Sequence, residues 1–74
     1  MMAVSTIRDA IKAAPFQPFI VYVADQRSYT IPHPDFVAIG PNNRTLIVFH
    51  DDGGASLLDM LMITGIDLLP PADS

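Results

Sequence analysis

Apolar and polar positions follow the alternation of short β-strands over most of the chain, and only the N-terminal segment has helical spacing. Ile7, Ala10, Ile11 and Ala14 fall on one face at that spacing, which predicts a helix over about residues 5–14. Thr6 and Asp9 fit a capping box, and Pro15 is expected to end the helix, because the residue before a proline avoids helical geometry.

Strand-forming segments follow, separated by clusters of turn residues. Residues 32–35 contain two prolines and predict a corner, because proline cannot donate to a β-ladder. Residues 40–43 and 51–54 carry Gly-Pro-Asn-Asn and Asp-Asp-Gly-Gly, which predict a loop and a hairpin turn. The expected extended segments are residues 19–24, 27–32, 36–39, 45–49, 55–59 and 63–68.

Residues 57–64 support two interpretations. Ser56 and Asp59 fit a second capping box and Gly65 could stop a helix, so a short helix is one of them. The Gly-Gly turn leads directly into this segment, however, and Ile63 and Ile66 alternate with polar neighbours. We therefore expect two strands joined by a tight corner at residues 60–62.

These elements predict a mainly β fold with one N-terminal helix. Short antiparallel strands at regular spacing are typical of a small, strongly bent antiparallel barrel, since closing a sheet removes its edges. The length of 74 residues fits a single domain, with the helix at about 5–14, the barrel at about 16–69 and a frayed tail at 70–74.

Half of the residues are hydrophobic, which is a high share for so short a chain. No cysteine is present, so disulfides cannot stabilise the small core. We therefore expect a homo-oligomer in which a second copy covers the apolar last third of the chain. The expected interface residues are Leu57, Leu58, Met60, Met62, Ile63 and Ile66.

The charge balance is acidic, with 4 Lys and Arg against 8 Asp and Glu. This balance argues against nucleic acid and anionic membrane surfaces as partners, because both are bound through basic residues. The N-terminal segment lacks the apolar stretch of a signal peptide, and the longest apolar segment, residues 57–69, is interrupted by polar residues. We expect a cytoplasmic protein without a membrane span.

The order of the parts resembles the Sm-like barrels, in which a short helix precedes five bent strands and a one-turn corner precedes the last. Residues 56–66 look like the fourth strand, corner and fifth strand of that family. The resemblance implies a ring of subunits that pair these two strands, and an RNA site near the first loop, where Asn42, Asn43 and Arg44 lie. The corner at residues 59–62 departs from the family because it has no basic residue.

Four phrases resemble a large group of short bacterial proteins to which no activity is assigned. They are Pro15-Phe16-Gln17-Pro18-Phe19, His33-Pro34-Asp35-Phe36, Asp52-Gly53-Gly54 and Ile63-Thr64-Gly65-Ile66. This resemblance covers most of the chain and implies a bacterial origin and a domain that stands alone.

The candidate chemistry is sparse. His33 with Asp35, and His50 with Asp52, could together form a metal-dependent hydrolase site, since two histidines and carboxylates can bind zinc or manganese. Their spacing matches no metal motif, and turns and corners use the same residues to bind backbone groups. We therefore predict a non-enzymatic interaction or regulatory module with no catalytic residues, no metal and no cofactor, and keep an RNA-binding ring and a metal hydrolase as alternatives.

Overall fold

The computed structural model describes residues 3–70, which form one helix followed by six short strands. Two single-turn 3-10 helices interrupt the run of strands. The elements are α1 (Val4–Lys12), β1 (Phe19–Val23), β2 (Ser28–Ile31), η1 (Pro34–Phe36), β3 (Val37–Ile39), β4 (Thr45–Phe49), β5 (Ala55–Asp59), η2 (Met60–Met62) and β6 (Ile63–Leu68).

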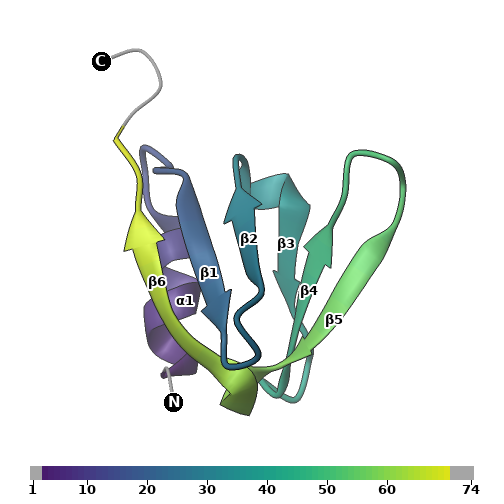
Figure 1. Cartoon of the computed structure of the whole chain (residues 1–74). Coiled ribbons are helices and arrows are strands. Elements are labelled where there is room, and N and C mark those ends of the chain that lie inside the picture. The colour runs from purple at the N-terminus through teal and green to yellow at the C-terminus, as the bar shows by residue number, and fades with distance from the viewer. Residues whose placement is uncertain (1–2, 71–74) are drawn as a thin grey trace.

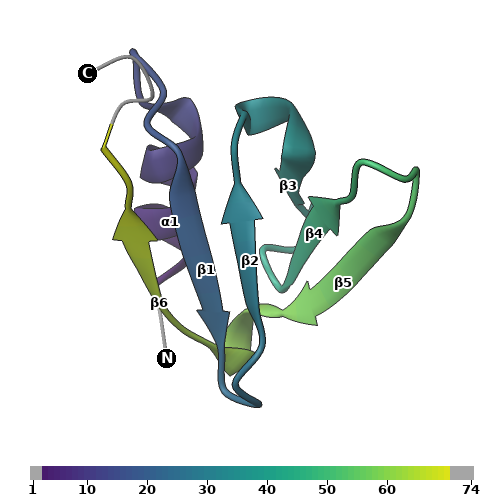
Figure 2. The same cartoon turned by 45° about the horizontal axis from the view of Figure 1, so that its top comes forward.

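The strands make two three-stranded antiparallel sheets, in the orders β2-β1-β6 and β3-β4-β5. Figures 1 and 2 show the sheets as two sides of a V, with β2 beside β3 and the η2 corner joining β5 to β6 at the base. The corner is held to the second sheet because the Met60 amide donates to the Arg44 carbonyl at 2.8 Å. It is held to the first sheet because the Ala24 amide donates to the Met62 carbonyl at 2.8 Å.

The core lies between the two sheets and is closed by α1, which lies behind β1 and β6 in both views. Phe19, Ile31 and Ile63 come from the first sheet, Leu46 comes from the second, and Ile7 comes from the helix. The remaining buried apolar residues are Val21, Val23, Val37, Val48, Leu58 and Met60. None of the buried residues among 3–70 is polar, so the side chains of the core contribute through apolar burial.

The helix has the predicted buried face but not the predicted cap. Ile7 is fully buried, as the spacing predicts. The helix begins at Val4 with Ala3 as its N-cap, so Thr6 lies inside the first turn, where its amide donates to the Ala3 carbonyl at 3.1 Å. The capping box predicted from Thr6 is therefore wrong. The helix ends at Lys12 rather than at residue 14, since the backbone is already extended at Ala13.

Of the two interpretations of residues 57–64, the structure has the two strands and not the short helix. β5 ends at Asp59, the 3-10 turn η2 forms the predicted corner, and β6 starts at Ile63. The Asp59 carboxylate accepts the Leu61 amide at 2.9 Å, so Asp59 caps this single turn rather than a helix that starts at Ser56. A mainly β fold with one N-terminal helix is confirmed, and the strands are arranged as two small sheets. Most of the predicted tail, residues 71–74, lies outside the described residues.

Within residues 3–70, no helix has both the length and the apolar composition that a bilayer span requires.

Candidate functional site

Large apolar side chains are exposed along the last third of the chain. Leu57 in β5 is 70% exposed, Leu61 in η2 is 66% exposed, and Leu68 in β6 is 57% exposed. Met62 in η2 is also exposed. Scattered exposed leucines are ordinary on a protein surface, but these follow one another through β5, the corner and β6. We call these four residues, Leu57, Leu61, Met62 and Leu68, the apolar strip.

The structure divides the six predicted interface residues into two groups. Leu58, Met60 and Ile63 lie in the core of their own chain, so they are almost fully covered without a partner, and Ile66 is half-buried against that core. Leu57 and Met62 are exposed. The surface left for an interface is therefore the apolar strip, which also includes Leu61 and Leu68, two residues that the sequence analysis omitted.

The exposure of Leu61 could have been predicted from the sequence. A single helical turn at residues 60–62 cannot direct three consecutive side chains into one core, and only Met60 is buried there.

β5 is an edge strand of the second sheet, and no other strand among residues 3–70 pairs with its outer edge. The His50 amide donates to the Gly54 carbonyl, and the Met60 amide donates to the Arg44 carbonyl, at the two ends of the β4–β5 ladder. Hydrogen-bonded and non-hydrogen-bonded pairs alternate along an antiparallel ladder, so the bonded residues of β5 are Ser56 and Leu58. The backbone N–H and C=O groups of Ala55, Leu57 and Asp59 therefore point away from β4.

The outer face of the second sheet is apolar beside that edge. The register places Leu57 opposite Ile47, and Ala55 opposite Phe49. Phe49 is also exposed, so Leu57 lies in a row of apolar side chains rather than alone. Asp59 is the only charged residue in β5, and it lies at the end of the strand.

The edge of β6 is less regular than the edge of β5. The Leu69 amide donates to the Pro18 carbonyl at 2.7 Å, so the same alternation leaves Ile66 and Leu68 with outward backbone groups. A shift of register between Tyr22 and Val23 interrupts the pairing of β6 with β1.

A hydrogen bond on the outer face joins the first sheet across β1 and β6. The Tyr22 hydroxyl donates to Oδ2 of Asp67 at 2.7 Å. This hydrogen bond raises the pKa of Tyr22, since it is made by the protonated hydroxyl and the carboxylate opposes a second negative charge.

Asn42, Asn43 and Arg44, the residues predicted to bind RNA, lie in the loop between β3 and β4 and line a groove of about 620 Å³. Leu57 and Leu61 line the same groove. The Asn42 carboxamide accepts the Arg44 amide at 3.0 Å, and Asn43 accepts a 2.6 Å hydrogen bond from the Arg8 guanidinium. Both asparagines thus have structural partners. The full lining is Val4, Asn42, Asn43, Arg44, Thr45, Leu57, Leu58, Asp59, Met60 and Leu61.

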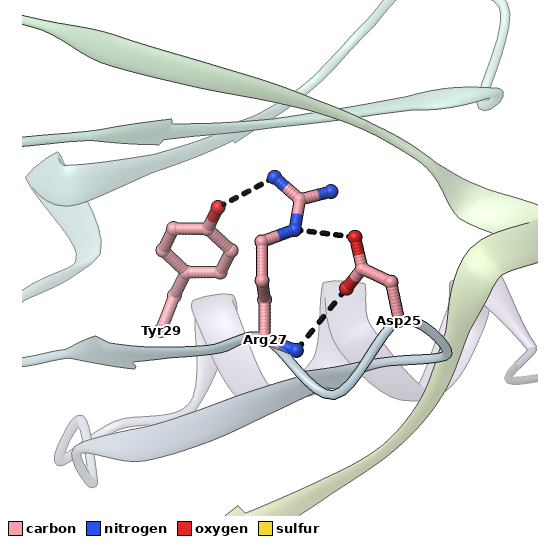
Figure 3. A network of polar contacts seen from close by, with 3 residues as sticks. All are labelled: Asp25, Arg27 and Tyr29. Carbon is pink, nitrogen blue, oxygen red and sulfur yellow. Dashed lines mark hydrogen bonds and ion pairs between the residues drawn. The ribbon is translucent and has the colours of Figure 1, made fainter.

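A polar network occupies the turn between β1 and β2 (Figure 3). Asp25 accepts the backbone amide of Arg27 at 3.1 Å and forms an ion pair with its guanidinium at 2.6 Å. The same guanidinium donates to the Tyr29 hydroxyl at 3.0 Å. The hydrogen bond from the Arg27 amide, reinforced by the guanidinium, lowers the pKa of Asp25. All three groups serve the local turn, since each partner lies two residues from the next.

The four residues of the predicted metal hydrolase site have separate roles. His33 and Asp35 are exposed at the η1 corner, where the His33 ring lies 6.0 Å from the Phe36 ring. The Asp52 carboxylate accepts the Gly54 amide at 2.9 Å in the hairpin turn. His50 Nε2 lies 2.8 Å from Ser56 Oγ, a contact across the hairpin that the sequence analysis missed. No group of three potential metal ligands occurs among residues 3–70.

No protein-family model, curated protein or solved structure matches this chain.

Proposed function

We propose that this protein is a non-enzymatic, self-associating interaction module whose apolar strip is covered by further copies of the same chain. The two sheets are, in this proposal, the two halves of a small bent barrel of Sm-like or SH3-like type. The η2 corner between β5 and β6 is compatible with such a barrel, as is the V between the sheets.

The observation that supports this proposal most strongly is the exposure of Leu57 in the middle of a strand with a free edge. Transfer of apolar surface from water is favourable by roughly 25 cal/mol per Å². A complex in which a second copy covers Leu57 is therefore stabilised by the burial of that side chain. A long and unprotected apolar edge strand is a template for pairing, and proteins that stay monomeric usually block it with charge, proline or a bulge. β5 carries none of these blocks along Ala55–Leu58.

Further support comes from the position of the strip on consecutive elements. Leu57, Leu61 and Leu68 lie on β5, η2 and β6, three elements that follow one another directly along the chain. The buried core below them does not depend on that partner, because its residues are already covered within the chain.

Native mass spectrometry at micromolar concentration tests the proposal. We expect a defined oligomer, and a double variant Leu57→Ser/Leu61→Ser that shifts to monomer. The matched control is Ser28→Ala/Thr30→Ala, which changes two exposed residues of β2 and is expected to retain the oligomer. A wild-type protein that remains monomeric at these concentrations would refute the proposal.

A second candidate function is the binding of single-stranded RNA in the groove beside β5. The convergence of Asn42, Asn43 and Arg44 with two exposed leucines supports it, because amide and guanidinium groups can bind bases and phosphates. Asp59 in the same groove opposes it. Filter binding of oligo-U and oligo-A at low salt is the test, with Arg44→Gln as the variant expected to weaken binding. The absence of binding at low salt would eliminate this candidate.

A further inference from the structure

We infer that two copies associate through a two-fold antiparallel pairing of β5 with β5, which joins their second sheets into one six-stranded sheet. This inference rests on the proposed self-association and specifies the edge, the register and the stoichiometry. The partner is a second copy of the chain, and the contact is isologous, so the same strand serves on both sides.

The register follows from the outward backbone groups of β5. Only Ala55, Leu57 and Asp59 can form hydrogen bonds away from β4, as the alternation along the β4–β5 ladder dictates. In the antiparallel arrangement that pairs all three, Leu57 lies opposite Leu57 of the second copy. Ala55 then lies opposite Asp59 of the second copy, and each of these pairs exchanges two backbone hydrogen bonds. A shift by two residues in either direction leaves at least one of these groups unpaired.

The side chains agree with this register. Leu57, the most exposed leucine of β5, meets Leu57 of the second copy at the two-fold axis. Directly opposed side chains on one face of a ladder interact favourably when both are apolar. Ile47 lies on the other side of Leu57 on the same face, so the contact extends the existing apolar row across the axis. The single charge of β5, Asp59, faces an alanine instead of the second Asp59, so like charges are kept apart.

The alternative pairing, β5 of one copy with β6 of the next, is disfavoured by the edge of β6. That edge has a register shift at Tyr22/Val23, and Pro70 follows its last residues. In the regular part of β6, only Ile66 and Leu68 have backbone N–H and C=O groups that point away from β1. β5 has three such residues, at alternate positions of the strand. A proline or a bulge at an edge is a device that prevents pairing, and here both occur at β6. A single β5–β6 contact between each pair of neighbouring copies would be heterologous and would build a ring or a filament.

Disulfide cross-linking tests the register, because the chain has no cysteine of its own. The Cα atoms of a hydrogen-bonded antiparallel pair lie about 5.5 Å apart, which is within the range that a disulfide bridges. We expect Leu57→Cys to form a covalent dimer under mild oxidation. Ala55→Cys is the matched control, since two copies of residue 55 are far apart in this register, and we expect it to remain non-covalent. Both residues are exposed, so neither variant disturbs the core.

The outcomes separate this inference from the proposed function. If the wild-type protein is an oligomer and Leu57→Cys alone forms the covalent dimer, the two-fold pairing is supported. If the wild-type protein is an oligomer but Leu57→Cys cross-links only when mixed with Leu68→Cys, the β5–β6 pairing is correct and this inference fails, while self-association stands. If the wild-type protein is monomeric, the proposed function fails and this inference fails with it.

Discussion

Leu57 in β5 and Leu58 beside it have opposite environments: Leu57 is exposed on the outer face opposite Ile47, whereas Leu58 is buried opposite Leu46. Successive side chains of a strand point to opposite faces, so this contrast follows directly from the extended backbone. It divides the apolar last third of the chain into a core half and a surface half. The self-association that we propose depends only on the surface half.

Replacement of these two leucines should therefore have different effects on the monomer. We expect Leu58→Ala to lower the free energy of unfolding by about 2–5 kcal/mol, because it leaves a cavity in the core. We expect Leu57→Ala to change it by less than about 0.5 kcal/mol, as is usual for exposed positions. Urea denaturation at a protein concentration too low for association measures both variants. Equal losses would mean that Leu57 is buried within its own subunit.

The hairpin turn between β4 and β5 should depend on the glycine at position 53. Gly53 has a positive φ of 92°, in the left-handed region where residues with a side chain are strained. Gly65 in β6 does not have a positive φ. A Cβ atom at either position would have no neighbour within 4 Å, so the two sites differ mainly in backbone conformation. We expect Gly53→Ala to lower the free energy of unfolding by about 1–2 kcal/mol. Gly65→Ala should be neutral or stabilising by up to about 1 kcal/mol. Thermal denaturation compares them, and a greater loss for Gly65→Ala would contradict this account of the turn.

The ion pair of Asp25 and Arg27 predicts a dependence of stability on acid pH. The folded-state pKa of Asp25 is lowered, so its contribution is present above the unfolded-state pKa and is lost as the pH falls through the lowered value. We expect Arg27→Gln to raise the Asp25 pKa toward its ordinary value of about 3.9, with the remaining shift due to the backbone amide. Carboxyl chemical shifts followed by NMR during acid titration measure this change. An unchanged Asp25 pKa in Arg27→Gln would show that the guanidinium does not contact Asp25 in solution.

The hydrogen bond between Tyr22 and Asp67 predicts the opposite behaviour at alkaline pH. The folded-state pKa of Tyr22 is raised, so this contribution is present below its ordinary value of about 10 and is lost as the pH rises through the raised value. We expect Asp67→Asn to lower the Tyr22 pKa toward the ordinary value. The chain has two tyrosines, so an ultraviolet absorbance titration in a Tyr29→Phe background isolates Tyr22. If Asp67→Asn leaves the titration of Tyr22 unchanged, the side-chain hydrogen bond between Tyr22 and Asp67 is absent in solution.

The positions of the strands along the chain could be predicted from the sequence because the signals for them are local, whereas their order in two separate sheets could not. Asp51-Asp52-Gly53-Gly54 indicates a hairpin turn, and the alternation after Ile63 favours a strand; the structure has both. The cap of the helix could not be predicted, since Thr6 is a favourable capping residue whereas the N-cap of the structure is Ala3, which makes no side-chain capping hydrogen bond.

The candidate surface was harder to predict than the fold. Residues 57–63 are apolar at nearly every position, so composition marks the segment as a whole and cannot separate Leu57 from Leu58. That separation depends on the register with β4, which is a long-range property. The contact of His50 with Ser56 depends on the same register, and it links residues that the sequence does not associate.

Amide hydrogen exchange at Leu57, measured by NMR over a range of protein concentrations, tests the association of β5 most directly. The N–H of Leu57 points away from β4, so it has a hydrogen-bond partner only if a second strand pairs with this edge. We expect the Leu57 amide to be protected at high concentration and to exchange rapidly on dilution, while the inward amides of Ser56 and Leu58 stay protected throughout. Rapid exchange of Leu57 at every concentration, with Ser56 and Leu58 protected, would contradict it.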